Sequence, residues 1–122
     1  MKSLIILLIL AACLLSGTVG NYIYINEVSE RLSAMIEALP APDDPMCGAR
    51  ISELINYWEE QRTAVCLSVS FTVADRISEQ AAVLAACCFC GDRFGYYATL
   101  ALLCDAVDDM RRLEQFSVEN LL

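Results

Sequence analysis

The longest apolar run of the chain lies at its N-terminus. After Lys2, the 24 residues 3–26 carry no charge, and the first acidic residue follows them. As a helix this run measures about 36 Å, which is enough to cross a hydrocarbon core of about 30 Å. Tyr22 and Tyr24 near its end suit the headgroup region, where a ring can be buried while its hydroxyl stays wet. The pattern predicts a membrane-spanning signal anchor over residues 1–26.

Beyond this run, apolar residues recur at the spacing of three and four that is typical of amphipathic helices. The spacing continues the first helix to about residue 39. All three prolines then lie in residues 40–46, which predicts a loop, and Asp44 with Pro45 predicts the N-cap and first turn of the next helix. The apolar stripes expected to face a core are Val28, Leu32, Met35, Ile36 and Leu39, then Ile51, Leu54, Ile55 and Trp58, then Val69, Val73, Ile77, Ala81, Leu84 and Cys88.

Residues 49–90 contain neither glycine nor proline. One helix of that length, about 63 Å, could not fold back to bury both of its stripes. A break is therefore predicted at residues 63–70, where β-branched and hydroxyl residues weaken helix propensity. Gly91 and Asp92 predict the next helix end and N-cap. A last helix follows, with an apolar stripe of Phe94, Tyr97, Leu100, Leu103, Val107, Met110 and Leu113.

Three uncharged stretches of 11 or 12 residues lie in this part of the chain, at residues 63–74, 80–91 and 94–104. Each measures about 17 Å as a helix, which is too short to span a bilayer, so we expect buried core helices. The predicted fold class is all-α. An N-terminal membrane-spanning helix runs into a small antiparallel bundle of about four helices, formed by residues 27–122.

The charges of the chain disfavour nucleic acid as a partner and predict the orientation of the chain in the membrane. The 122 residues carry 16 Asp and Glu against 8 Lys and Arg, a formal net charge of −8, which disfavours binding to nucleic acid. Lys2 is the only charged side chain before residue 27, so the positive-inside rule predicts a cytoplasmic N-terminus, with residues 27–122 outside the cell membrane. The expected partners are the lipid bilayer and another membrane protein or a second copy of the chain.

Two other fates of the N-terminal segment stay open. Thr18 and Gly20 place small residues at the −3 and −1 positions of a cleavable secretory signal. Residues 10–13 have small residues before a cysteine, the pattern of a lipoprotein acylated at Cys13. Either fate would replace the retained span.

In a retained span, small residues recur every four positions, at Ala12, Ser16 and Gly20. This spacing lets two spanning helices approach closely, which predicts a helix-dimer face. The alternative interpretation is that membrane helices are simply rich in small residues.

The chain has seven cysteines and no histidine, so the commonest metal ligand and general base is missing. Cys87 and Cys90 form a C-x-x-C motif, with Cys88 between them. In redox enzymes this motif opens a helix, where the dipole lowers the thiol pKa, but here it is expected to close one. A zinc site would need a second pair at a matching distance. Buried free thiols that pack as small hydrophobes are the preferred interpretation, and disulfides of unreadable connectivity stay open.

Carboxylates are abundant, but none marks a catalytic pair. Asp105 and Asp109 are four residues apart and Asp108 can pair with Arg112, so a solvated, partly paired helix face is expected. Trp58 is interpreted as a core anchor. The sequence has no glycine-rich phosphate loop, no Ser/His/Asp set and no Cys/His pair, so neither a cofactor nor an enzymatic activity is predicted.

Positions spread along nearly the whole chain carry a resemblance to a known family. They are the MKSLIILLIL start, Gly20-Asn21-Tyr22, residues 28–32, Trp58, Asp75-Arg76-Ile77, Gly91-Asp92 and residues 113–121. With them the chain resembles domain-of-unknown-function family 4363, a family of short membrane-anchored bacterial proteins. The resemblance implies an N-terminal membrane segment and a small helical domain, and it implies no activity. Where the family pattern has an acidic residue and a histidine, this chain has Ser70 and Phe71.

We therefore expect a single-span membrane protein whose outer helical domain is a non-catalytic interaction or accessory subunit. The first alternative is an extracytoplasmic thiol protein, redox-active or metal-binding, built on Cys87, Cys88 and Cys90. The second alternative is the lipoprotein acylated at Cys13.

Overall fold

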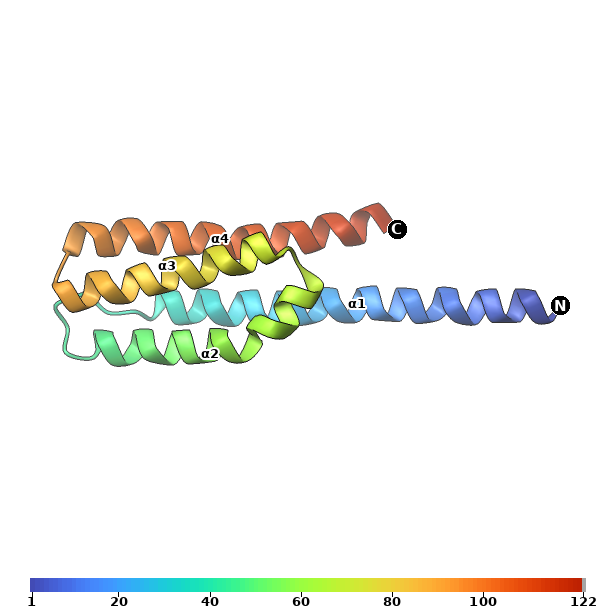
Figure 1. The fold of residues 1–122 in the computed structure, drawn as a ribbon, viewed down its shortest axis with the longest axis horizontal. Helices are drawn as coiled ribbons and strands as arrows, with labels where there is room; N and C mark the ends of the chain where they lie inside the picture. Colours follow the sequence, from blue (N-terminus) through green and yellow to red (C-terminus); the bar gives the residue numbers. More distant parts are fainter. Residues whose placement is uncertain (122) are drawn as a thin grey trace.

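The computed structural model describes residues 1–121, and every regular element in that range is a helix. Helix α1 spans Lys2–Glu37, α2 spans Cys47–Ser68, α3 spans Phe71–Cys90 and α4 spans Arg93–Leu121. Successive helices run in opposite directions, and the longest connection is the proline-containing loop between α1 and α2 (Figure 1). The predicted all-α fold, a long N-terminal helix running into an antiparallel bundle of four helices, is confirmed.

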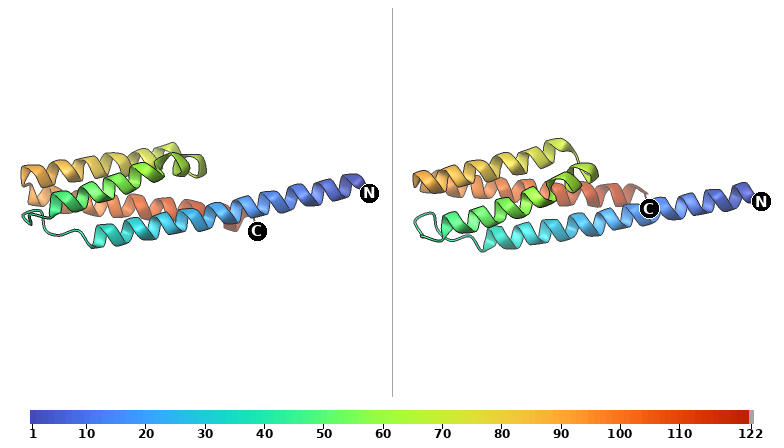
Figure 2. Two further views of the ribbon diagram at one scale, coloured as in Figure 1. Left: turned by 90° about the horizontal axis from the view of Figure 1, so that it is seen from below. Right: turned by 60° about the horizontal axis from the view of Figure 1, so that its bottom comes forward.

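Each helix of the bundle packs against two others. Helices α1 and α3 both contact α2 and α4, so the four helices form a closed ring around one core. The N-terminal part of α1 extends well beyond this bundle, and α4 ends beside the middle of α1 (Figures 1 and 2). Helix α1 therefore has two parts in different surroundings, one packed in the bundle and one projecting from it.

The core takes one apolar stripe from each helix. Trp58 and Tyr96 are its largest fully buried side chains, and Trp58 Nε1 donates a hydrogen bond to Ser78 Oγ at 2.8 Å between α2 and α3. Trp58 is thus the core anchor that the sequence predicts. The buried apolar residues are Ile25, Val28, Leu32 and Ile36 of α1, Cys47, Ile51, Leu54, Trp58 and Val65 of α2, Ala74, Ile77, Ala81 and Leu84 of α3, and Tyr96, Leu103, Ala106, Val107 and Met110 of α4.

The predicted helix breaks after α2 and α3 are confirmed, and each has a local cause. Helix α2 ends at Ser68, and Ser70 Oγ accepts a hydrogen bond from the Thr72 N–H at 3.1 Å as the N-cap of α3. At the far end of α3, Gly91 has a φ of 71°, the left-handed conformation that glycine adopts without strain.

Asp92 lies between this glycine and α4, which begins at Arg93. Its Oδ1 accepts a hydrogen bond from the Gly95 N–H at 3.0 Å, which is the predicted N-cap. A Cβ added at Gly95 would collide with the Asp92 carboxylate and lie 3.0 Å from Cys87 Sγ. The glycine at position 95 therefore leaves room for the Asp92 cap and the Cys87 thiol.

The predicted start of α2 is wrong by two residues. The helix begins at Cys47, with Met46 at its N-cap position, and no side chain caps it. Asp44 Oδ1 instead accepts a hydrogen bond from the Met46 N–H at 2.8 Å. The aspartate thus stabilises the turn before the helix, because that turn brings its carboxylate to a nearer backbone donor.

The expected core stripe of α4 is wrong at its start. Phe94 is 87% exposed and Tyr97 is 44% exposed, whereas Tyr96 is fully buried. The Tyr96 hydroxyl donates a hydrogen bond to the backbone oxygen of Pro40 at 2.8 Å. Because the Asp92 cap and this hydrogen bond fix the rotation of the first turn, Tyr96 enters the core in place of its two aromatic neighbours.

The expectation that the three uncharged stretches are buried core helices is correct only in part. Residues 63–74 contain the α2–α3 turn, and all three stretches expose large apolar side chains. A helix in a four-helix bundle buries only the stripe that faces its neighbours, so the remaining apolar residues stay on the surface. The large exposed residues of the three stretches are Leu67, Phe71, Val83, Phe89, Phe94, Tyr97 and Leu102, and Leu113, expected in the core, is exposed as well.

Candidate functional site

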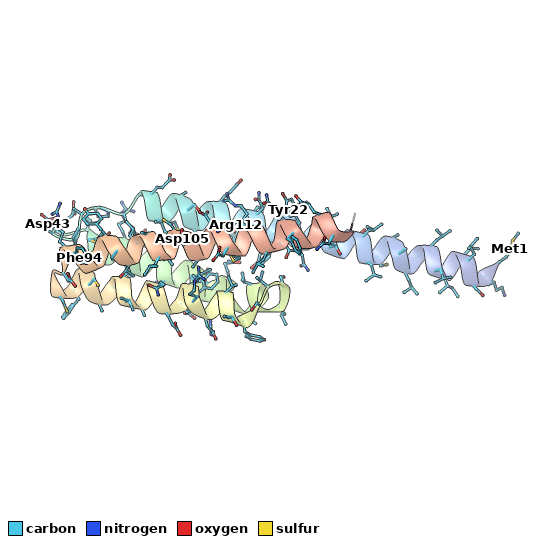
Figure 3. The ribbon with its side chains drawn as sticks, turned by 90° about the horizontal axis from the view of Figure 1, so that it is seen from above. Met1, Tyr22, Asp43, Phe94, Asp105 and Arg112 are labelled. Atoms are coloured by element: carbon cyan, nitrogen blue, oxygen red, sulfur yellow. The ribbon has the colours of Figure 1, made fainter. Side chains whose placement is uncertain are left out.

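The projecting part of α1 is the least covered apolar surface of the molecule. Every residue from 1 to 17 is exposed, and the side chains point away from the helix on all sides with no other helix beside them (Figure 3). Within residues 1–121, α1 is the one helix long and apolar enough to cross a membrane, and none of its apolar window is buried. A core helix would bury one face, so this segment is not explained by packing within the chain.

The predicted dimer face lies on this segment and is uncovered. Ala12, Ser16 and Gly20 are all exposed, and a Cβ added at Gly20 would meet nothing within 4 Å. Thr18 Oγ1 donates a hydrogen bond to the backbone oxygen of Leu14 at 2.9 Å, so this hydroxyl is satisfied inside the helix, as a membrane interior requires. The role of the small residues stays a prediction.

Two side-chain hydrogen bonds join α1 to α2 at Asn21 and Tyr24. Ser68 Oγ donates a hydrogen bond to Asn21 Oδ1 at 3.3 Å, and the Tyr24 hydroxyl donates to Gln61 Oε1 at 2.6 Å. Ile25 is the first fully buried residue of the helix. Helix α1 continues through residue 26 without a break, so the predicted domain boundary falls inside a helix that belongs to both parts.

The three thiols of the alternative site face different neighbours. They lie in the last turn of α3, where Cys90 is exposed and Cys87 and Cys88 are half-buried. Cys87 lies against Gly95 of α4, whereas Cys88 forms a side-chain hydrogen bond with Cys47 at the start of α2. The C-x-x-C motif closes a helix, as the sequence predicts, and its thiols do not converge on one point.

Cys88 belongs to a polar cluster in the core that sequence reasoning missed. The fully buried Cys47 lies between Cys88 and Tyr96, with its Sγ donating to the Tyr96 hydroxyl at 3.5 Å. The Tyr96 hydroxyl in turn donates to the backbone oxygen of Pro40. One signal could have found the cluster: in an antiparallel bundle the α1–α2 loop and the α3–α4 turn lie at the same end, which brings these residues together.

The Cys88 thiol of this cluster is a poor nucleophile. Burial, together with the hydrogen bond to Cys47, raises the pKa of Cys88 to about 11. At pH 7 Cys88 is then in the thiol form, whereas the thiolate is the form that attacks disulfides and binds metals. Burial also raises the pKa of Tyr96. The cluster is therefore suited to hydrogen bonding between the loop and the starts of α2 and α4.

The remaining cysteines correct the expectation of buried thiols. All seven are free, and only Cys47 is fully buried, while Cys13, Cys90 and Cys104 are exposed. The stripe positions of α3 and α2 could not accommodate all of them, because each helix turns only part of its surface inward. Among the described residues, no group of three or more His, Cys, Asp or Glu side chains is placed to hold a metal ion.

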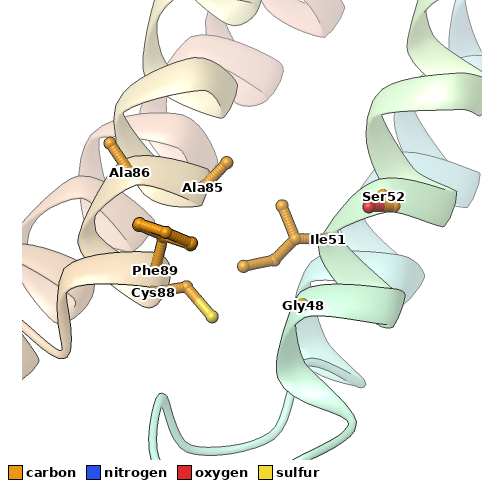
Figure 4. Close-up of a pocket in the computed structure, with 7 residues that line it drawn as sticks. All are labelled: Gly48, Ile51, Ser52, Ala85, Ala86, Cys88 and Phe89. Atoms are coloured by element: carbon orange, nitrogen blue, oxygen red, sulfur yellow. The ribbon is translucent and has the colours of Figure 1, made fainter.

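An apolar groove of about 440 Å³ lies beside the thiol cluster, between α2 and α3 (Figure 4). Its one titratable group is the Cys88 thiol, and Phe89 at its edge is 93% exposed. The groove offers apolar contact and no acid–base pair. Its lining residues are Gly48, Ile51 and Ser52 on α2 and Ala85, Ala86, Cys88 and Phe89 on α3.

The acidic face of α4 is paired with arginines of two helices. Asp109 accepts hydrogen bonds from Arg76 of α3 at 2.6 Å and from Arg112 at 2.5 Å. Arg112 therefore pairs with Asp109 and not with the predicted Asp108, because the position three residues away is the nearer one in this geometry. These ion pairs lie at the surface, where each contributes about 1 kcal/mol or less.

No family model, curated protein or solved structure matches this chain. The function therefore rests on three features of the molecule. They are the apolar helix that projects from the bundle, the hydrogen bond that joins Asn21 of α1 to the α2–α3 turn, and the raised pKa of the Cys88 thiol.

Proposed function

We propose that this chain is a single-span membrane protein whose helical bundle lies outside the cytoplasm and acts as a non-catalytic interaction or accessory subunit. One observation carries the proposal: residues 1–17 of α1 are all exposed, while the bundle closes its core without them. In water this surface would cost about 25 cal/mol for each Å² left exposed. A hydrocarbon layer removes that cost, and the helix satisfies its own backbone hydrogen bonds there.

The charge distribution supports the proposed orientation. Lys2 is the only charged side chain in residues 1–26, whereas residues 27–122 carry all 16 acidic residues and seven of the eight basic ones, a net charge of −9. Positive charge is retained on the cytoplasmic side of a membrane helix. The proposed location is the cell membrane, with the N-terminus in the cytoplasm. The resemblance to domain-of-unknown-function family 4363 agrees with this proposal and stays a prediction.

The chemistry of the bundle surface supports a non-catalytic role. The groove beside Cys88 is apolar, and the Cys88 thiol is protonated near neutral pH. Asp109 is engaged by two arginines. Phe89 and Phe94 are 93% and 87% exposed at the end of the bundle that points away from the free part of α1. Exposed aromatic side chains of this kind are typical of surfaces that contact another protein.

Alkaline carbonate extraction tests the span. The full-length chain is expected to stay in the membrane pellet, because its α1 segment is held by the hydrocarbon core. Release of the full-length chain into the soluble fraction would contradict the proposal.

Native thiols make the orientation measurable. Cys90 and Cys104 are exposed on the bundle, whereas Cys13 lies within the apolar segment. A membrane-impermeant maleimide added to intact cells is expected to label the wild-type chain. The double variant Cys90→Ser, Cys104→Ser is the matched control and is expected to lose most of the label. Labelling that requires cell lysis would place the bundle in the cytoplasm.

The mass of the mature chain separates the retained span from the two other fates. Cleavage after Gly20 would leave a chain that begins at Asn21, which keeps its hydrogen bond to Ser68, so the bundle would survive it. Acylation at Cys13 would remove the preceding residues and add a lipid mass. The full-length mass without an adduct is the result that the proposal requires.

Thiol counting tests the remaining alternative, an extracytoplasmic thiol protein. The protonated Cys88 is expected to react slowly in the native protein and quickly after denaturation. Rapid reaction of Cys88 in the native protein would favour the thiol alternative over the proposed subunit.

A further inference from the structure

The end of the bundle from which α1 emerges carries exposed apolar side chains. Leu67 is 84% exposed and Phe71 is 68% exposed, one on each side of the α2–α3 turn. Phe116 of α4 is 63% exposed, and it lines one shallow groove together with Val73, two residues after Phe71. Leu67, Phe71 and Phe116 are called the apolar rim below.

A hydrogen bond fixes the height of this rim along α1. Ser68 in the turn donates to Asn21 Oδ1 at 3.3 Å, so the turn lies beside Asn21, while the C-terminal end of α4 reaches somewhat farther along α1 (Figure 1). The α2–α3 turn and the C-terminal end of α4 lie at the same end of the bundle as the projecting helix (Figure 1). The turn is therefore held beside the end of the projecting segment.

The length of the projecting segment places the rim relative to a membrane. About 19 residues, 2–20, lie beyond the turn, and as a helix they measure about 28 Å, close to the thickness of a hydrocarbon core. When this segment spans a bilayer, its end lies at the boundary with the headgroups. The rim then lies at the level of the headgroup layer, where exposed aromatic and aliphatic side chains are favoured.

The charges near the rim indicate which headgroups it suits. The turn lies within the uncharged residues 63–74, and the charges that flank this stretch, Arg62 and Asp75, pair with each other at 2.8 Å. Glu119 on the last turn of α4 adds an exposed carboxylate at this end of the bundle, whereas Glu114 is buried and Arg112, beside Phe116, pairs with Asp109. Anionic lipids would repel the Glu119 carboxylate, whereas a zwitterionic headgroup layer would not.

We infer that the apolar rim inserts into a zwitterionic headgroup layer of the membrane that α1 spans, so that the bundle stands on the bilayer surface. The inference rests on the proposed membrane span and adds a second lipid contact to it. Leu67 and Phe71 carry this contact at the α2–α3 turn, and Phe116 carries it at the end of α4.

Tryptophan quenching by brominated lipid tests the contact. The full-length chain is reconstituted into phosphatidylcholine vesicles whose acyl chains are brominated near the headgroups, and unbrominated vesicles serve as the reference. The variant Phe71→Trp places a reporter on the rim, and Phe89→Trp places one at the other end of the bundle, where Phe89 is 93% exposed. Trp58 is 1% exposed and contributes the same background to both variants.

The expected result is a loss of about half of the added emission for Phe71→Trp in brominated vesicles, with no loss for Phe89→Trp. Bromine quenches a tryptophan only when the two are in contact, and only the rim reporter is expected to reach the interfacial layer. Leu67→Trp is a second rim reporter and is expected to behave like Phe71→Trp. Both native residues are exposed, so neither replacement disturbs the core.

Four outcomes would overturn the inference. Equal quenching of Phe71→Trp and Phe89→Trp would show that the bundle lies on its side. A blue-shifted Phe71→Trp emission without quenching would show that a second copy of the chain covers the rim. Absence of quenching in a chain that resists alkaline extraction would leave the span intact and remove the rim contact, whereas release of the chain by alkali would remove both.

Discussion

Ser29, which is fully buried, and Ser78, which is half-buried, differ in whether their hydroxyls are paired. Ser29 on α1 is fully buried, and its Oγ has no hydrogen-bond partner among the described residues. Ser78 on α3 accepts the indole hydrogen bond of Trp58 at 2.8 Å. A buried hydroxyl without a partner loses its hydrogen bonds to water and gains none in the protein. A paired hydroxyl replaces those bonds and also provides a hydrogen-bond partner for its neighbour. The same substitution at the two positions should therefore act in opposite directions.

We predict that Ser29→Ala raises the free energy of unfolding by about 1 kcal/mol, because it removes an unpaired buried group. Ser78→Ala is expected to lower it by about 1–2 kcal/mol, because it leaves the Trp58 N–H unsatisfied. Thermal unfolding of the detergent-solubilised chain, followed by circular dichroism, measures both changes. A loss of stability in Ser29→Ala would show that its hydroxyl has a partner in the folded protein.

The sequence predicts some of the buried residues and misses others for a physical reason. Trp58 is recognisable as a core residue because its neighbours repeat at helical spacing. Cys47 and Tyr96 are not, because their burial depends on a contact between segments 49 residues apart and on the backbone oxygen of Pro40. A helical pattern reports which face is apolar but not which side chains meet across the core.

At the scale of the helices, the sequence predicts where each helix ends better than it predicts which face of the helix turns toward the core. Gly91 and the hydroxyl residues before Phe71 end and start helices through local hydrogen bonds, which depend only on nearby residues. The first turn of α4 has aromatic residues at positions 94, 96 and 97, so apolar spacing alone fits more than one rotation. The Asp92 cap and the Tyr96 hydrogen bond select one of them.

A pair of glycine replacements tests the role of the α3 terminus. Gly91→Ala is expected to cost about 1 kcal/mol, because alanine is strained at the left-handed φ of 71°. Gly48→Ala in α2 is the matched control: its added Cβ meets nothing within 4 Å, and alanine is expected to stabilise the helix by about 0.5–1 kcal/mol. Chemical denaturation measures both. Equal effects of the two replacements would show that the backbone at Gly91 is not held in the left-handed conformation.

At the scale of the whole molecule, α1 supplies one helix of the bundle and the whole of the projecting segment. The described side-chain hydrogen bonds from α1 to α2 begin at Asn21, and the buried apolar residues of α1 begin at Ile25. The excess of apolar residues in the sequence, 57% of the chain, is thus divided between a core, a projecting helix and an exposed surface. The sequence predicts the core and the projecting helix, but many of the exposed apolar residues of the bundle were expected in the core.

Two truncations separate the roles of α1. A chain that lacks residues 2–20 is expected to fold into a soluble, cooperatively unfolding bundle, because these residues bury nothing in the core. A chain that lacks residues 2–32 also loses Ile25, Val28 and Leu32, and it is expected not to fold, at a cost of about 2–5 kcal/mol for each buried side chain. Near-ultraviolet circular dichroism of Trp58 distinguishes the two results. Failure of the shorter deletion to fold would show that the projecting segment contributes to the bundle.

The continuity of α1 has a mechanical consequence. Its 36 residues form one helix of about 54 Å without a proline or a loop between the projecting part and the bundle. A continuous helix of this kind transmits a change in the tilt of its axis from the projecting part to the bundle. If the projecting part of α1 spans a bilayer as proposed and tilts by about 20°, the mean tilt of spanning helices, the far end of the bundle moves sideways by about 9 Å. A change in bilayer thickness would thus be converted into a displacement of Phe89 and Phe94, the exposed aromatic residues at the distal tip.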